Sequence, residues 1–329
     1  MEFTTEIKNA TDQIYQKISK AVPEIEWLTH APYIYKINQL KKEKNAVILA
    51  HNYQTPEIYY GISDFSADSL ALAVEAAKTK ADIIVMCGVH FMAETAKLMS
   101  PEKKVLLPDM RAGCSLSSSI TGEDVRNLKK QNPGVPVVSY VNTSADVKAE
   151  TDVCCTSANA VKIVNSLGVK KVIFLPDDYL AKYVASQTDV EIISWKGTCE
   201  VHEQFNDQEI NEIRKNNPGI KIIAHPECPP DVINASDFAG STSGMIKYVK
   251  DNQPEKVMMV TECSMSDNVQ VDNPNVQFIR PCNLCPHMKR ITLPKILDCL
   301  ENETNEILMS DETINKARKS VERMTEIGR

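Results

Sequence analysis

The feature that most constrains the fold of this chain is an internal repeat. The stretches "KKQNPGVPVVSYVN" (129–142) and "RKNNPGIKIIAHPE" (214–227) align without a gap, so that the Asn-Pro-Gly tripeptide at 132–134 matches the one at 217–219. Each stretch combines a polar helical end, a turn and a short β-branched run, which is typical of a helix–turn–strand unit. A third copy without the tripeptide, "KKEKNAVILAHNY" (41–53), precedes the second at a slightly longer offset. Such a repeat predicts tandem related domains.

The order of elements downstream of each copy is also the same. A loop leads to a helix, a second strand and a third strand, and the three helices are expected at 68–80, 156–168 and 241–253. Short apolar strands that alternate with amphipathic helices are typical of parallel sheets covered on both faces. We predict an α/β fold of three tandem homologous three-layer αβα domains with parallel sheets around a pseudo-threefold axis. A single large doubly wound sheet is the competing prediction.

The domain boundaries follow from the repeat length. A chain of 329 residues is too long for one ordinary domain. We predict a first repeat with N-terminal helices at 1–116, a second repeat at 117–204, a third repeat at 205–290 and a C-terminal helical segment at 291–329 that packs on the repeats.

Charge and apolar patterning narrow the class of partner. The net charge is -7 and no basic block is present, which argues against nucleic acid as a partner. The start of the chain, "MEFTTEIKNATDQIY", has no apolar signal segment, and the longest apolar stretch (83–93) is too short to span a bilayer. We therefore expect a cytoplasmic protein that binds neither nucleic acid nor membrane.

Polar side chains stand at matched positions where the first strand of each copy ends. Tyr140 of the second copy and His225 of the third copy occupy equivalent positions, and His51 occupies the same position in the first copy. Two residues later, Tyr53, Asn142 and Glu227 are equivalent in the same way. Because open α/β sheets bind ligands at the carboxyl ends of their strands, these six side chains are candidates for one binding site.

Hydroxyl residues recur at the expected starts of the helices that follow. Thr156 and Ser157 of the second copy are equivalent to Ser241 and Thr242 of the third copy. In the first copy, the segment "SADS", which ends at Ser69, stands at this position. Such residues normally cap helices, and converging helix N-termini also bind anions. The expected ligand therefore carries carboxylates or phosphates. Neither a G-x-G-x-x-G motif nor a P-loop sequence is present.

Cysteines recur with the same period. Cys114, Cys199 and Cys285 each lie a few residues past the third strand of a copy, and their spacing follows the offset between the tripeptides to within a single position. Three related domains around a common axis would bring these thiols to one point. Three thiolates without a fourth ligand in register favour a cubane iron–sulfur cluster with one exposed iron, whereas structural zinc normally takes four protein ligands.

A further cysteine leaves two alternatives open. Cys282 lies three residues before Cys285 and is either the ligand in its place or a redox partner that forms a regulatory disulfide with it. The spacing favours Cys285, which follows Ile279 by six residues as Cys199 follows Ile193.

Taken together, these residues resemble the quinolinate synthase family of de novo NAD biosynthesis. The resemblance runs nearly end to end and includes "ILAHNYQ" (48–54), "FMAETAKLMSPEK" (91–103), "CCTSANA" (154–160), "AHPEC" (224–228) and "CPHMKRITLPK" (285–295). The family has three homologous αβα domains around a [4Fe–4S] cluster. It condenses iminoaspartate with dihydroxyacetone phosphate to quinolinate, with loss of phosphate and two waters.

The resemblance implies roles for the candidate residues. Cys114, Cys199 and Cys285 would hold one [4Fe–4S] cluster per chain, with the open iron as Lewis acid. Tyr53 and Glu227 are our choice for the proton transfers that interconvert the ketone and aldehyde forms of the triose. The other residues that would surround the substrate are His51, Tyr140, Asn142 and His225, and the hydroxyl residues that would hold its anionic groups are Ser69, Ser157, Ser241 and Thr242.

Several points stay open in the sequence. Tyr140 would orient a carboxylate or polarise the carbonyl, and His202 either serves the site or packs beside the cluster. An enzyme that supplies iminoaspartate is a candidate partner. The alternatives to this transferase are a three-domain anion-binding protein with structural zinc and an aconitase-like hydro-lyase that acts on a small dicarboxylate.

Overall fold

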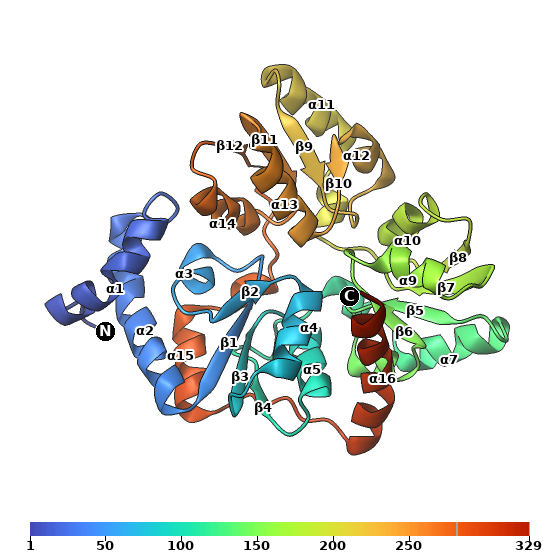
Figure 1. Cartoon of the computed structure of the whole chain (residues 1–329), viewed down its shortest axis with the longest axis horizontal. Helices are drawn as coiled ribbons and strands as arrows, with labels where there is room; N and C mark the ends of the chain where they lie inside the picture. Colours follow the sequence, from blue (N-terminus) through green and yellow to red (C-terminus); the bar gives the residue numbers. More distant parts are fainter. Residues whose placement is uncertain (281, 329) are drawn as a thin grey trace. The chain divides into compact units, whose positions relative to one another are not determined.

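The strands form three separate four-stranded parallel sheets in residues 1–280 and 282–328, the part of the chain that the computed structural model describes. Helices flank each sheet, as Figure 1 shows for β1, β3 and β4 beside α4 and α5. The predicted α/β fold with three αβα repeats is confirmed, and the alternative of one doubly wound sheet is wrong. The three sheets have the strand orders β2-β1-β3-β4, β6-β5-β7-β8 and β10-β9-β11-β12.

Twelve short strands build these sheets in the described residues. Those of the first sheet are β1 (Ala46–His51), β2 (Phe65–Ala67), β3 (Ile83–Cys87) and β4 (Lys104–Leu106). Those of the second are β5 (Val137–Tyr140), β6 (Val153–Cys155), β7 (Lys171–Leu175) and β8 (Glu191–Ser194). Those of the third are β9 (Lys221–Ala224), β10 (Phe238–Ala239), β11 (Lys256–Val260) and β12 (Gln277–Ile279).

One strand in each sheet was not predicted. β2, β6 and β10 have only two or three residues and lie in the segments that we expected to be loops. Each pairs in parallel with the first strand of its sheet and forms an edge. A run of two or three residues is too short to show an alternating pattern, so only the partner strand identifies it.

Helices connect the strands. Before and within the first repeat they are α1 (Thr5–Ile18), α2 (Glu24–Glu43), α3 (Pro56–Tyr59), α4 (Ser69–Lys78) and α5 (His90–Met99). The second repeat has α6 (Ser115–Ser118), α7 (Gly122–Gln131), α8 (Ala145–Ala149), α9 (Ala160–Ser166) and α10 (Asp178–Ala185). The remaining helices are α11 (Asp207–Asn216), α12 (Pro230–Ala235), α13 (Thr242–Asn252), α14 (Ser264–Asp272), α15 (Leu293–Asn302) and α16 (Asp311–Gly328). Two 3₁₀ turns, His202–Gln204 and Met288–Arg290, complete the described elements.

The Asn-Pro-Gly tripeptides end two helices in the same way. Asn132 and Asn217 follow α7 and α11, and each side-chain amide donates to the carbonyl four residues earlier at 3.0 Å. The glycines have φ values of +79° and +81°, a backbone conformation that L side chains rarely adopt. The tripeptide therefore stops the helix and turns the chain into the next strand.

The start of α9 differs from the prediction. We expected a helix from Thr156, but α9 begins at Ala160 because a turn precedes it. Oδ1 of Asn159 accepts a hydrogen bond from the Thr156 N–H at 2.7 Å, and the Asn159 N–H donates to the Thr156 carbonyl at 3.1 Å. Ser157 therefore lies in this turn, whereas Ser241 caps α13 as expected by accepting from the Gly244 N–H at 3.1 Å.

The chain forms two compact units. The first unit comprises Met1–Ala112, Glu262–Asn275 and Leu284–Ile307, and the second comprises Gly113–Thr261, Val276–Asn283 and the residues from Leu308 on. The C-terminal helices are divided between them: α15 packs on α2 and β3, and α16 packs on α8, β6 and α9. The domain boundaries in the sequence remain a prediction, and residue 329 of the C-terminal segment lies outside the described residues. Among the described helices, none is long and apolar enough to cross a membrane.

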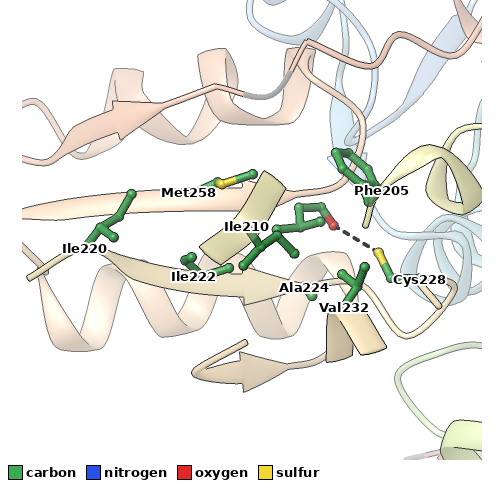
Figure 2. Close-up of a cluster of buried hydrophobic side chains, with 9 residues drawn as sticks. Phe205, Ile210, Ile220, Ile222, Ala224, Cys228, Val232 and Met258 are labelled. Carbon is green, nitrogen blue, oxygen red and sulfur yellow. Dashed lines mark hydrogen bonds between the residues drawn. The ribbon is translucent and has the colours of Figure 1, made fainter. Parts of the chain in front are cut away.

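The core of the third repeat lies beneath the loop that follows β9. Figure 2 shows Phe205 and Cys228 at one end of this cluster and Ile220 at the other. The Cys228 thiol donates to the Val260 carbonyl at 3.5 Å, and Ile222 on β9 is fully buried. The loop that carries Glu227 therefore starts from a packed apolar base.

Replacing Ile222 should destabilise the second unit. We expect Ile222→Ala to lower the free energy of unfolding by about 3 kcal/mol, because the substitution leaves a cavity between sheet and helices. Ile25→Ala is the matched control, since Ile25 is 78% exposed and should change the free energy by less than about 0.5 kcal/mol. Urea unfolding followed by circular dichroism measures both, and equal effects would contradict the assigned burial.

Candidate active site

The residues at the ends of the first strands adopt the same local structure in two repeats. Nδ1 of His51 accepts a hydrogen bond from the Tyr53 N–H at 3.2 Å. Nδ1 of His225 accepts in the same way from the Glu227 N–H at 3.4 Å. In each case the ring turns back over the loop that carries the residue two positions later. Positions paired by sequence offset are thus equivalent in structure within the first and the second unit.

Glu227 is the centre of a buried polar cluster in the second unit. Its Oε2 lies 2.9 Å from Nδ1 of His202, and its Oε1 accepts a hydrogen bond from the Tyr140 hydroxyl at 2.5 Å. Nε2 of His202 lies 3.0 Å from the Thr261 hydroxyl. The side chains of Glu227, His202 and Tyr140 are all buried, so these partners take the place of water around the carboxylate.

The environment of Glu227 favours its ionised form. Burial on its own would raise the pKa of Glu227, but the electrostatic influence of the His202 and His225 imidazoles and the hydrogen bonds from His202 and Tyr140 outweigh this effect. The pKa therefore lies well below the ordinary value of a glutamate. Glu227 is therefore a carboxylate, not a carboxylic acid, at neutral pH, and it accepts hydrogen bonds from its neighbours.

His225 links the cluster to the turn before α9. Its Nε2 lies 3.1 Å from the Ser157 hydroxyl, and its ring stacks on that of His202 with centroids 4.9 Å apart. Because Nδ1 of His225 accepts from a backbone N–H, the proton of the neutral ring belongs on Nε2, which then donates to Ser157. The Ser157 hydroxyl proton is thereby directed away from the ring.

Asn142 offers an acceptor without a partner. Its Oδ1 is buried and accepts no hydrogen bond within the described residues. The carbonyls on either side of it, those of Val141 and Thr143, both accept from the ammonium of Lys148, which is fully buried. Lys148 therefore fixes the loop around Asn142 and leaves the side-chain amide available for a ligand.

The loop that carries Tyr53 in the first unit is fixed in a comparable way. The Tyr53 carbonyl accepts from the Lys289 ammonium at 2.9 Å, and the Asn268 amide donates to the carbonyls of Asn52 and Gln54 at 3.1 and 2.7 Å. Three consecutive carbonyls are therefore held by two side chains. These hydrogen bonds fix the backbone around Tyr53.

Lys289 also forms a buried ion pair. Its ammonium lies 2.9 Å from Oε1 of Glu262, whose side chain is fully buried. The same carboxylate accepts from the backbone N–H groups of Ser264 at 2.9 Å and Cys285 at 3.4 Å. Burial raises the pKa of Glu262, and Lys289 opposes that rise. This pair connects the Tyr53 loop to the backbone of Cys285 within the first unit.

Cys114 and Cys199 are held close together in the second unit. The Ser115 hydroxyl donates to the Thr198 carbonyl at 3.0 Å and accepts from the Glu200 N–H at 3.1 Å, so it bridges the residues on both sides of Cys199. Burial raises the pKa of the Cys199 thiol well above its ordinary value, and negative charge on Glu227 and Cys114 adds to the rise. Cys199 Sγ also lies 3.1 Å from Nδ1 of His202.

The candidate residues fall into both units. The second unit contains Cys114, Tyr140, Asn142, Ser157, Cys199, His225, Glu227, Ser241 and Thr242. The first unit contains His51, Tyr53, Ser69 and Cys285. Ser69 is the first residue of α4 and follows the N-cap residue Asp68. Cys285 is half-buried, whereas Cys282 is exposed.

Comparison with known proteins identifies the family. A sequence model described as "Quinolinate synthetase A protein" matches residues 35–326. A quinolinate synthase of Sinorhizobium fredii is 59% identical over 327 residues, which cover 99% of this chain and 91% of the relative. A quinolinate synthase of Caulobacter vibrioides is 56% identical over 329 residues, which cover 99% and 90%. The chain belongs to the quinolinate synthase family. Membership favours an enzyme of NAD biosynthesis over an anion-binding protein.

Sequence reasoning missed several residues that hold the candidate residues in place within each unit. Lys289 lies in the stretch at 285–295 that carries the family resemblance, and Lys148 lies on α8, yet a lysine in a helical stretch is normally solvated. Thr261, Glu262 and Asn268 follow the second strand of the third repeat, where no repeat position singled them out. His202, which the sequence left undecided, lies in the cluster with Cys199 and Glu227.

Loss of the Lys289 ammonium should destabilise the first unit. Lys289→Met leaves the Glu262 carboxylate buried without its cation, so we expect the free energy of unfolding to fall by about 2 kcal/mol or more. Lys247→Met is the control, because Lys247 pairs with Asp251 on the surface. Adding Glu262→Gln to Lys289→Met should restore part of the loss in a double-mutant cycle. Additive effects would show that the two side chains do not interact.

Proposed function

We propose that this chain condenses iminoaspartate with dihydroxyacetone phosphate to quinolinate, with loss of phosphate and two waters, as a cytoplasmic transferase. The observation that carries the proposal is the buried carboxylate of Glu227, held ionised by His202 and Tyr140 beside Cys199. The reaction needs a base in a dry site, because the triose must move a proton between adjacent carbons before the ring can close. An enzyme that produces iminoaspartate would supply the other substrate.

The cysteines would hold the cofactor. Cys114, Cys199 and Cys285 are half-buried thiols, and the Ser115 bridge holds the first two close together. Three thiolates suit a [4Fe–4S] cluster that keeps one iron without a protein ligand, so the donor set fits the group that the family resemblance implies. When bound, the cluster supplies a Lewis acid that binds an oxygen of the substrate.

Substrate binding would use the polar atoms around Glu227. Asn142 Oδ1 lacks a donor within the described residues, and a triose hydroxyl or the imine N–H would provide one. The Ser157 hydroxyl, oriented by His225, would donate to a carboxylate or phosphate oxygen. Ser69, Ser241, Thr242 and His51 would add further hydrogen bonds to the anionic groups. Because His51, Ser241 and Thr242 are buried, their hydrogen bonds to an anionic group would be strong.

Proton transfer would start from Glu227. Its carboxylate is ionised and is held in place by two hydrogen bonds, so it would take the proton from the triose carbon. The Tyr140 hydroxyl, which already donates to Oε1, would stabilise the negative charge that remains when the proton moves on. Tyr53 would return a proton to the neighbouring carbon or oxygen. Its backbone is held by Lys289 and Asn268, so its position is defined.

Replacing Glu227 tests the base. We expect Glu227→Gln to lower turnover by about 10²-fold or more, because an amide keeps the size of the side chain but accepts no proton. Iron and sulfide content should stay at the wild-type level, since Glu227 is no cluster ligand in this proposal. Glu209→Gln on the exposed face of α11 is the control. Quinolinate formation under anaerobic conditions is measured, and near-normal turnover would remove Glu227 from the mechanism.

Replacing the cysteines tests the cofactor. Cys199→Ser should lose both the iron–sulfur absorption and the activity, whereas Cys282→Ser should keep both if Cys285 is the third ligand. Wild-type protein purified without oxygen should be brown and contain about four irons and four sulfides. Loss of the cluster in Cys282→Ser and its retention in Cys285→Ser would assign Cys282 as the ligand instead.

A further inference from the structure

We propose that protein without the iron–sulfur cluster binds a single Zn²⁺ ion through Cys199, His202 and Glu227. One ligand atom from each of these residues lies within 4.8 Å of the other two. A thiolate, an imidazole and a carboxylate are the donors that proteins use for zinc, and catalytic zinc sites take three protein ligands and one water. The set is distinct from the three cysteines of the proposed cluster and shares only Cys199 with them.

The distances within the cluster suit a metal ion after a small adjustment. Nδ1 of His202 lies 3.1 Å from Cys199 Sγ and 2.9 Å from Glu227 Oε2. Around a tetrahedral zinc ion with ordinary bond lengths, donor atoms of these kinds lie about 3.4–3.6 Å apart. Nδ1 of His202 needs to move away from the other two donors by roughly half an ångström to admit the ion, which rotations about the side-chain bonds supply.

The surrounding residues already orient the donors as a metal site requires. Nε2 of His202 lies 3.0 Å from the Thr261 hydroxyl, which leaves Nδ1 to face the thiol and the carboxylate. The Tyr140 hydroxyl binds Oε1 of Glu227 and leaves Oε2 toward His202. Such outer partners fix the tautomer of the imidazole and the direction of the carboxylate, and they raise metal affinity.

Charge also favours a cation at this point. The Glu227 carboxylate is buried within 4.8 Å of the Cys199 thiol, and a divalent ion bound there would neutralise the carboxylate and the thiolate that forms on binding. Zinc binds nitrogen and sulfur donors more tightly than ferrous iron does, so zinc in cluster-free protein would occupy Cys199 and compete with assembly of the proposed cluster.

The experiment uses the full chain with Cys114→Ser and Cys285→Ser, which removes two of the proposed cluster ligands and leaves the zinc ligands intact. Zinc is added to this protein, and calorimetry should show one ion bound per chain. Adding His202→Leu should weaken binding by at least about 10-fold, as expected for the loss of a ligand that metal sites conserve. Cys228→Ser is the matched control, because this buried thiol neighbours Glu227 and is no member of the site.

X-ray absorption at the zinc edge tests the donor set without relying on the folding of a variant. Zinc added to wild-type protein freed of iron should show one sulfur and about three nitrogen or oxygen neighbours. Two or three sulfur neighbours, or undiminished affinity in the His202→Leu variant, would overturn the proposal. Iron and sulfide analysis of the anaerobic wild-type protein is read separately, so a failure of the cluster assignment is recognised apart from a failure of the zinc site.

Discussion

A carboxylate in a protein interior is stable only where hydrogen-bond donors replace its water, and this requirement shapes the second unit around Glu227. The donors come from distant parts of the sequence: Tyr140 ends β5, and His202 lies in the turn after Cys199. His202 is in turn bound to Thr261 at the end of β11. The buried charge therefore ties together the strand ends of two sheets, and the site has its geometry because the charge must be paired.

Two lysines, the fully buried Lys148 and the half-buried Lys289, meet a similar requirement in the loops. The backbone carbonyls of a buried loop cannot accept hydrogen bonds from water, so they need donors from the protein. Lys148 serves the carbonyls beside Asn142, and Lys289 serves the carbonyl of Tyr53. Lys289 is itself neutralised by Glu262. The rigidity of both loops thus depends on ammonium groups that the surrounding fold holds against carbonyl oxygens.

Three of the proposed roles involve Cys199 or the residues that surround it. The thiol lies beside the imidazole of His202 and near the carboxylate of Glu227, and Ser115 holds it close to Cys114. In our proposals, Cys199 is a ligand of the cluster and Glu227 is the base. When the cluster is missing, both residues and His202 bind a zinc ion. In these proposals the cluster and the zinc ion compete for the single thiolate of Cys199, so the metal supply would decide which of the two binds.

The sequence alone determined the repeat, the longer strands, the Asn-Pro-Gly turns and the positions of His51, Tyr140 and His225 at strand ends. These features are local: an apolar run, a glycine at positive φ or a matched offset is visible in consecutive residues. Only the tertiary structure decided the edge strands β2, β6 and β10, the late start of α9 and the roles of His202, Lys148, Thr261 and Lys289. Those depend on partners far away in the chain, since a two-residue strand needs its neighbour and a lysine is buried only where the fold supplies its acceptors.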